Sequence, residues 1–239
     1  HYLHDNQTEH SLSNNLVLSI FQSRDRNLWL GTEGGGLNMF DPQTQKFSRF
    51  KHDPNDKSSL SSDVAWSVYE DKLGDLWVGT WGGGLNRWLL SDRKTGKAKF
   101  HRYFKSKNKH SGLQSSVIYD IIGDQYGAIW FSSNRGLTRY QVATDQYKQF
   151  DMTHGLQGNE FNLNAALGSR NGQLFFGGSN GFNAFYAKNV TLNAHAPKVV
   201  LTAVKKLNKK TGTVNVNWHG PKPVFNYQDY AVTFEFAAL

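Results

Sequence analysis

Short apolar runs alternate with glycine-rich turns along most of this chain. One unit shows the pattern most clearly, with four segments that have the alternation or the short apolar run of a β-strand, namely residues 64–70, 76–80, 85–88 and 98–103. Residues 71–74 read as a tight hairpin, because Gly74 can take the positive φ that such a turn requires. The unit is therefore predicted to be a sheet of four antiparallel strands.

The same unit recurs with a period of about 40–50 residues, which is typical of β-propeller blades. Its strand–turn–strand copies are residues 27–38, 75–86 and 128–138, with a degenerate fourth copy at 173–183. Trp29, Trp77 and Trp130 occupy equivalent places in the first three copies. An aromatic ring there can fill the wedge between neighbouring sheets, so we interpret these tryptophans as core residues rather than binding residues.

The predicted strands of the other units follow from alignment with the second. They are residues 17–22, 28–32, 37–40 and 46–50 in the first unit, 117–122, 129–132, 137–140 and 146–150 in the third, and a fourth innermost strand beginning near Asn162. Residues 2–14 match residues 50–62, so the chain starts at the end of an earlier blade. We expect residues 1–195 to be the C-terminal part of a larger propeller. Its open edges favour association into a homo-oligomer.

After residue 195 the pattern changes to that of a different β unit. Residues 198–207, 213–218 and 230–237 read as three strands, too few to bury a sandwich core on their own. Residues 196–239 are therefore predicted to be a truncated β-sandwich segment. The fold class is all-β, a partial β-propeller of four-stranded antiparallel blades followed by this segment.

The net charge of +8 is concentrated in two basic clusters, residues 93–109 and 205–210. Such clusters can attract nucleic acid, anionic lipid or acidic glycans, or serve only as solvated loops. No nucleic-acid-binding motif accompanies them, so we expect no nucleic-acid partner. The chain has no cysteine and no apolar run near the roughly 20 residues of a membrane span.

Blade topology places the glycine-rich turns on the same face as the links between blades. Loops on one face of a rigid scaffold are the usual place of recognition. The candidate ligand-binding residues are the varied members of those turns: Glu33, Trp81, Asn134, Arg135 and Asn180. Trp81 suits stacking on a sugar ring or packing against an adjacent loop. Trp66 and Tyr119, on innermost strands, either point at the channel or lie in the core.

No residue pattern in the chain indicates catalysis. The nine histidines lack metal-ligand spacing, and residues 53–56 read as a turn rather than a calcium loop. The glycine runs at 34–36 and 82–84 neither open a helix nor carry the lysine of a phosphate-binding loop. We therefore expect no catalytic residue, no metal and no cofactor.

Residues 28–40, LWLGTEGGGLNMF, followed by 47–50 and 60–64, closely resemble the two-component regulator propeller repeat. The likeness is weaker in the third and fourth copies, where Ser132-Ser133 and Gly177-Gly178 replace Gly-Thr. Residues 197–204 and 232–239 look like the start of the Y_Y_Y β-sandwich that follows these repeats in the family.

The resemblance implies a non-catalytic, periplasmic ligand-sensing region of a bacterial receptor that controls a histidine kinase or diguanylate cyclase. It implies a carbohydrate or other small ligand, and contact with the membrane only through segments of a longer parent protein. Two other functions stay open. One is a propeller enzyme of the streptogramin-lyase type, for which His52 and His154 are the loop candidates. The other is a passive protein-interaction scaffold.

Overall fold

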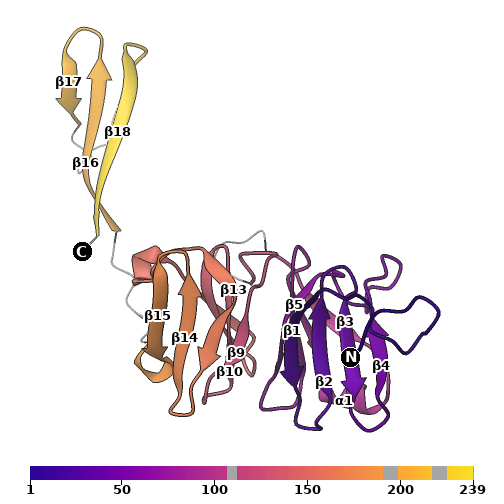
Figure 1. Cartoon of the computed structure of the whole chain (residues 1–239). Coiled ribbons are helices and arrows are strands. Elements are labelled where there is room, and N and C mark those ends of the chain that lie inside the picture. The colour runs from indigo at the N-terminus through magenta and orange to yellow at the C-terminus, as the bar shows by residue number, and fades with distance from the viewer. Residues whose placement is uncertain (107–111, 191–198, 217–224, 239) are drawn as a thin grey trace. The chain divides into compact units, whose positions relative to one another are not determined.

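The structure, a computed structural model, describes residues 1–106, 112–190, 199–216 and 225–238. The chain divides into two compact units, His1–Val190 and Thr191–Leu239. The boundary predicted at residues 195 and 196 lies outside the described residues. The described part of the first unit contains four antiparallel sheets in succession, which we call blades 1 to 4 (Figure 1).

Blades 1 and 2 each have four strands in sequence order. Blade 1 consists of β1 (Val17–Gln22), β2 (Leu28–Thr32), β3 (Leu37–Asp41) and β4 (Lys46–Phe50). Blade 2 consists of β5 (Ala65–Glu70), β6 (Leu76–Thr80), β7 (Leu85–Trp88) and β8 (Phe100–Tyr103), with the short helix α1 (Leu90–Lys94) between its last two strands. These bounds agree with the predicted strands to within one residue, except at the start of β8.

Blades 3 and 4 continue the series less regularly. Blade 3 consists of β9 (Ile121–Gly123), β10 (Ala128–Ser133), β11 (Gly136–Gln141) and β12 (Gln146–Phe150). The described part of blade 4 has three strands, β13 (Phe161–Gly168), β14 (Gln173–Gly178) and β15 (Gly181–Tyr186). Two 3-10 turns, η1 (Met152–His154) and η2 (Ala187–Asn189), precede and follow that blade.

The second unit forms one antiparallel sheet in the order β17-β16-β18. Its strands are β16 (Val199–Asn208), β17 (Gly212–Asn215) and β18 (Asp229–Ala238). All three of the strands expected after residue 195 are therefore present, with the end of the middle one, 217–218, outside the described residues. The fold class is confirmed as all-β, a series of propeller blades followed by a separate three-stranded sheet.

Two local predictions were wrong. The inner strand of blade 3, expected over residues 117–122, is reduced to β9, because Tyr119 and Asp120 both bond to Ser132 and break the regular ladder. The outer strand of blade 2 was expected from residue 98 but begins at Phe100. It is preceded by helix α1, an insertion that has no counterpart in blade 1.

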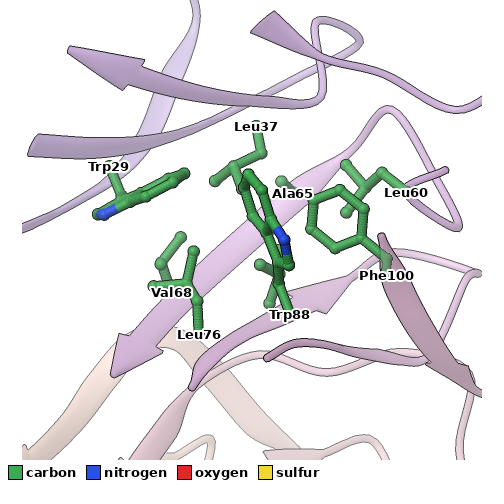
Figure 2. Close-up of a cluster of buried hydrophobic side chains, with 9 residues drawn as sticks. Trp29, Leu37, Leu60, Ala65, Val68, Leu76, Trp88 and Phe100 are labelled. Atoms are coloured by element: carbon green, nitrogen blue, oxygen red, sulfur yellow. The ribbon is translucent and has the colours of Figure 1, made fainter. Parts of the chain in front are cut away.

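The core of the first unit lies between neighbouring blades. Trp29 of blade 1 packs edge-on against Trp88 of blade 2, with 5.8 Å between ring centroids, in a cluster that includes Val68 and Leu76 (Figure 2). Equivalent clusters around Trp77 and Trp130 join blades 2 to 3 and 3 to 4. These three tryptophans are at most 1 % exposed, which confirms their predicted core role.

Each wedge tryptophan also donates a hydrogen bond to the residue six positions earlier. The Nε1 of Trp77 lies 2.8 Å from Asp71 Oδ2, and that of Trp130 lies 3.0 Å from Asp124 Oδ2. Ser23 Oγ takes the same place for Trp29, at 2.9 Å. Each acceptor lies in the hairpin that precedes the strand carrying the tryptophan. The indole therefore packs between two blades and also holds this hairpin in place.

The glycines two positions after Trp29 and Trp77, Gly31 and Gly79, are required by close packing between blades. A Cβ built on Gly79 would lie 2.5 Å from Ser67 Oγ and 2.7 Å from Ile118 Cγ2 of blade 3. On Gly31 it would lie 2.5 Å from the carbonyl oxygen of Ala65 in blade 2. Both contacts are shorter than real Cβ atoms make, so any side chain here would push the next blade outward.

Candidate ligand-binding face

The turns of successive blades are joined by hydrogen bonds to the links between them. Gly34 and Gly36 donate to the carbonyl oxygen of Asp63 at 2.9 and 2.7 Å. The neighbouring Ser62 Oγ donates to the carbonyl oxygen of Trp81 at 2.9 Å. The link at residues 62–63 therefore holds the second turn of blade 1 and that of blade 2 together.

The next link repeats this arrangement one blade further on. Gly84 donates to the carbonyl oxygen of Ser116 at 2.9 Å, and Ser115 Oγ donates to Asn134 Oδ1 at 2.8 Å. The turns that carry Trp81 and Asn134 thus bond to two consecutive residues. They lie on the same face, as the blade topology predicts.

The third link completes the series. Gly136 donates to the carbonyl oxygen of Asn159 at 2.7 Å, while Asn180 donates through its backbone to Gln157 Oε1 at 2.8 Å. A continuous line of hydrogen bonds therefore runs from the turn of blade 1 to the turn of blade 4. We call the surface formed by these turns and links the loop face. All five predicted site residues lie on it.

Buried asparagines of the third strands hydrogen-bond to the links and hold them in position. Asn86 is fully buried, accepts from the Ser61 backbone at 3.0 Å and donates to Ser61 Oγ at 2.7 Å. Asn38 makes the same pair of bonds to Ser13 in blade 1, at 2.9 and 2.7 Å. The sequence signal was available, because each asparagine ends the Gly-Gly-Gly-Leu-Asn run, but we interpreted its glycines as a turn and its Leu-Asn pair only as the start of the next strand.

Arginines on the outer strands hold the same links from the side. Arg102 Nε donates to the carbonyl oxygen of Ser59 at 2.7 Å, and its Nη2 donates to Asp56 O at 2.7 Å. Arg49 bonds in the same way to Ser11 and Thr8 in the link before blade 1. The links are therefore ordered by the blades below them, which gives the loop face a fixed shape.

The five predicted residues differ in whether they already have hydrogen-bond partners. Asn134 is committed to Ser115, and the backbone of Asn180 is committed to Gln157. The carboxylate of Glu33 and the guanidinium of Arg135 are exposed and make no hydrogen bond or ion pair with any described residue. They are available to a ligand.

Trp81 projects from the turn of blade 2 with 52 % of its surface exposed. Its ring packs against Trp66 of the inner strand β5 of the same blade, at 4.6 Å between centroids, rather than against an adjacent loop. Trp66 in turn stacks on Tyr119 of blade 3, at 5.3 Å and 11° between planes. The three rings form one aromatic row that begins on the loop face and crosses from blade 2 to blade 3.

The row ends at acidic groups of blades 3 and 4. Tyr119 Oη donates to Glu160 Oε1 at 2.5 Å, and burial together with this carboxylate raises the pKa of Tyr119 to about 12. The neighbouring Asp120 accepts a hydrogen bond from the backbone of Ala165 at 2.7 Å. Burial raises the pKa of the Asp120 carboxyl to about 7. Backbone hydrogen bonds from Ala165 and Ala166 lower it by a smaller amount.

The two loop histidines have local partners. His154 Nδ1 lies 2.9 Å from Asp151 Oδ1 in the cap of η1, and His52 Nδ1 lies 2.8 Å from the carbonyl oxygen of Leu60. Among the residues that the structure describes, no three His, Asp or Glu side chains gather closely enough to hold a metal ion. Over the same residues, no helix has the length and hydropathy of a membrane span.

Comparison with known sequences gives a family and a relative. Residues 11–34 and 59–82 match the family described as two component regulator propeller. Histidine kinase P4 from Formosa agariphila is 34 % identical over 101 residues, which cover 42 % of this chain and 7 % of that protein. The chain therefore spans a small part of the length of this relative.

Solved structures show the same fold. The extracellular domain of BT3049 from B. thetaiotaomicron, described as a hybrid two component system, superposes with a TM-score of 0.73 at 22 % identity, covering 98 % of this chain and 31 % of that one. Virginiamycin B lyase from Staphylococcus aureus, determined with quinupristin, gives 0.52 at 12 % identity, covering 98 % and 73 %. At these identities the likeness concerns the propeller architecture alone.

Proposed function

The chain carries two-component regulator propeller repeats, and we propose that it is the ligand-sensing region of a bacterial signal-transduction receptor. In this role it lies outside the cytoplasm, in the periplasm, and carries out no chemistry itself. The likeness to a histidine kinase supports a kinase as the output of the parent protein. The observation that carries the proposal is the hydrogen-bonded loop face, which presents Trp81 and unpaired charges on a rigid scaffold.

The chemistry of this face favours a small polar ligand with one apolar side, such as a carbohydrate. An exposed indole supplies a flat apolar surface at little entropic cost, since only two torsions are fixed. Glu33 and Arg135 supply an acceptor and a set of donors for polar groups on the ligand. Because the links are fixed by buried asparagines and arginines, little ordering is needed on binding.

Trp81→Ala is expected to weaken ligand binding about tenfold while leaving the fold intact, because stacking is lost from an exposed side chain. The ligand is first found by a thermal-shift screen of oligosaccharides, amino acids and nucleotides, in which a bound compound raises Tm. Calorimetric titration then compares the variant with the parent chain.

Tyr126→Ala is the matched control. This tyrosine is 50 % exposed but lies in the hairpin between β9 and β10, at the opposite end of the strands. Its removal is expected to leave affinity unchanged. Equal losses in the two variants, or a screen in which no compound shifts Tm, would count against ligand sensing at this face.

The enzyme alternative rests on the fold shared with virginiamycin B lyase. Such an enzyme would convert its substrate, so product formation in the same screen distinguishes it from a sensor. A passive scaffold would bind another protein and none of the small compounds.

A further inference from the structure

A pocket lies between blades 1 and 2 at the end of the strands opposite the loop face. It is bounded by the hairpins at residues 23–27 and 71–74, which join the first two strands of each blade, and by helix α1. Because successive strands are antiparallel, these hairpins lie at the other end of the blades from the turn of Trp81. The pocket has a volume of about 710 Å³, which is within the range of small-ligand sites.

The insertion that carries α1 forms one wall of this pocket. The backbone N–H of Leu90 donates to Asp75 Oδ1 at 2.7 Å, and Trp88 Nε1 donates to the carbonyl oxygen of Lys97 at 2.9 Å, so both ends of the insertion are fixed. Leu90 also packs closely on the neighbouring hairpin, because a Cβ built on Gly74 would lie 2.8 Å from Leu90 Cδ2. The wall is therefore an ordered part of blade 2.

Apolar side chains make up most of the inside of the pocket. The most deeply buried are Trp29 and Trp88, which come from blades 1 and 2 (Figure 2). Met39 and Phe50 of blade 1 and Leu73 of blade 2 line it further out. Leu73 is largely exposed, although it is a large aliphatic residue. A bound apolar group would cover it and remove apolar surface from water.

A buried guanidinium also lines the pocket. The side chain of Arg93, in α1, is only 9 % exposed, and its Nη2 lies 3.4 Å from Glu70 Oε1 and 3.6 Å from Asp25 Oδ2. Its Cζ lies 5.6 Å from the centroid of the Trp29 ring. Its Nη1 is buried and has no hydrogen-bond partner among the described residues. A buried donor without an acceptor is costly, so a ligand that supplies an acceptor here would be stabilised.

The charges that line the pocket favour an anion. Three cationic side chains, Arg24, Arg93 and Lys94, and two anionic ones, Asp25 and Glu70, leave one positive charge. The guanidinium of Arg24 is already committed to backbone carbonyl oxygens of the neighbouring hairpin, at 2.6 and 3.4 Å. Lys94 is exposed and makes no hydrogen bond or ion pair with any described residue. A single negative charge on the ligand would balance the site.

We infer that this pocket binds a small monocarboxylate with an aromatic or aliphatic body. The carboxylate accepts from Arg93 and Lys94, since hydrogen bonds between charged groups are the strong ones. The body lies against Met39, Phe50 and Leu73. An amine would be repelled by the two cationic groups, and a sugar is disfavoured because the wall is mostly apolar. The site is separate from the loop face and does not depend on the sensing role proposed above.

The test titrates the full chain with probes that differ in charge and in body. They are 3-phenylpropanoate, octanoate, acetate, 3-phenylpropanamide and 3-phenylpropylamine, followed by calorimetry and tryptophan fluorescence. We expect the first two to bind, and acetate and the amine not to bind. The amide is expected to bind about tenfold more weakly than 3-phenylpropanoate, because a charged acceptor is replaced by a neutral one.

Arg93→Gln is expected to weaken the binding of 3-phenylpropanoate about tenfold and to remove its preference over the amide. This change also removes the partner of the buried Glu70, so a second variant leaves both residues in place. Ser48 is exposed on β4 and lines the pocket, and the ring of Ser48→Trp is expected to fill it and lower affinity at least about tenfold. Gln146→Trp, at an exposed position on β12 of blade 3, is the matched control and should leave affinity unchanged.

Three results would overturn the inference. If neither 3-phenylpropanoate nor octanoate binds, or if the acid and its amide bind equally, the pocket is not a carboxylate site. If Ser48→Trp binds as tightly as Gln146→Trp, the carboxylate binds elsewhere on the chain. If Trp81→Ala weakens binding, the probes occupy the loop face. Each of these results would leave ligand sensing at the loop face standing, because that proposal is tested by other compounds.

Discussion

Trp77→Ala is expected to lower the free energy of unfolding of the propeller unit by about 4 kcal/mol or more. Removing a fully buried tryptophan typically costs about 3–5 kcal/mol, because the cavity left between two packed layers closes only in part. The change also leaves the buried carboxylate of Asp71 without its indole donor and removes the ring beneath Arg87. Urea denaturation of the parent and variant chains measures the difference.

Two variants separate the wedge from the hydrogen bond. Trp77→Phe keeps most of the ring volume but not the N–H, so a loss of about 1–3 kcal/mol is expected. Trp81→Ala removes the same residue type from an exposed turn four positions further on and is expected to cost under about 1 kcal/mol. A Trp77→Ala variant as stable as Trp81→Ala would show that the tryptophan wedge does not hold the blades together.

Asp120→Asn is expected to stabilise the protein above pH 7 and to leave it unchanged near pH 4. The pKa of this carboxyl is raised to about 7 in the folded protein, from about 3.8. Between these values the folded state holds a proton that the unfolded state has released, so stability falls as pH rises through this window. A shift of this size corresponds to up to about 4 kcal/mol at pH 8.

The amide of the variant has no proton to lose and can still accept from Ala165. The difference in unfolding free energy between Asp120→Asn and the parent should therefore grow from about pH 4 to pH 7 and level off above pH 7. Asp41→Asn is the control. Hydrogen bonds from Gln43 and Thr44 lower the pKa of the Asp41 carboxyl, so this group is already ionised at pH 5 and the effect of the variant should not change above that pH. A constant difference for both variants would mean that Asp120 titrates normally.

The strands of blades 1 and 2 were predictable because the turns between them contain glycines whose only role is to adopt a positive φ. Gly74 and Gly84 both adopt positive φ, at 85° and 73°, and so mark the turns without ambiguity. The wedge tryptophans then fix which strand is which. Where these markers weaken, as at Ser132 in blade 3, the prediction of the inner strand was wrong as well.

The loop face was predictable from topology, but the β-bulges at Leu18 and Trp66 in the inner strands were not. Because successive strands of a blade are antiparallel, the second turn and the link to the next blade emerge at the same end. The sequence alone therefore predicts that Trp81 and Arg135 lie on one face. A bulge depends on pairing between strands, and the sequence of one strand does not reveal it. The small residues opposite the bulges, Gly31 and Gly79, were the signal, but a glycine there is equally consistent with close packing.

The repeat accounts for both the packing of the blades and the ordering of the links with the same few residues. Tryptophan and glycine set the spacing between blades, and asparagine and arginine hold the links over them. The tips of the turns differ between the copies, as Glu33, Trp81 and Asn134 show, while the residues that pack blades 1 and 2 recur.

A cross-linking measurement tests most directly whether the inner strands of blades 1 and 4 meet, as the hydrogen bond from Asn164 Nδ2 to the carbonyl oxygen of Leu18 at 3.0 Å indicates. The chain has no cysteine, so Leu18→Cys and Asn164→Cys introduce a unique pair of thiols, which dibromobimane joins with a gain in fluorescence when both react within one molecule. We predict efficient intramolecular cross-linking of this pair and none for Leu18→Cys with Tyr126→Cys. Absence of the first cross-link, or equal yields from the two pairs, would contradict this arrangement of the blades.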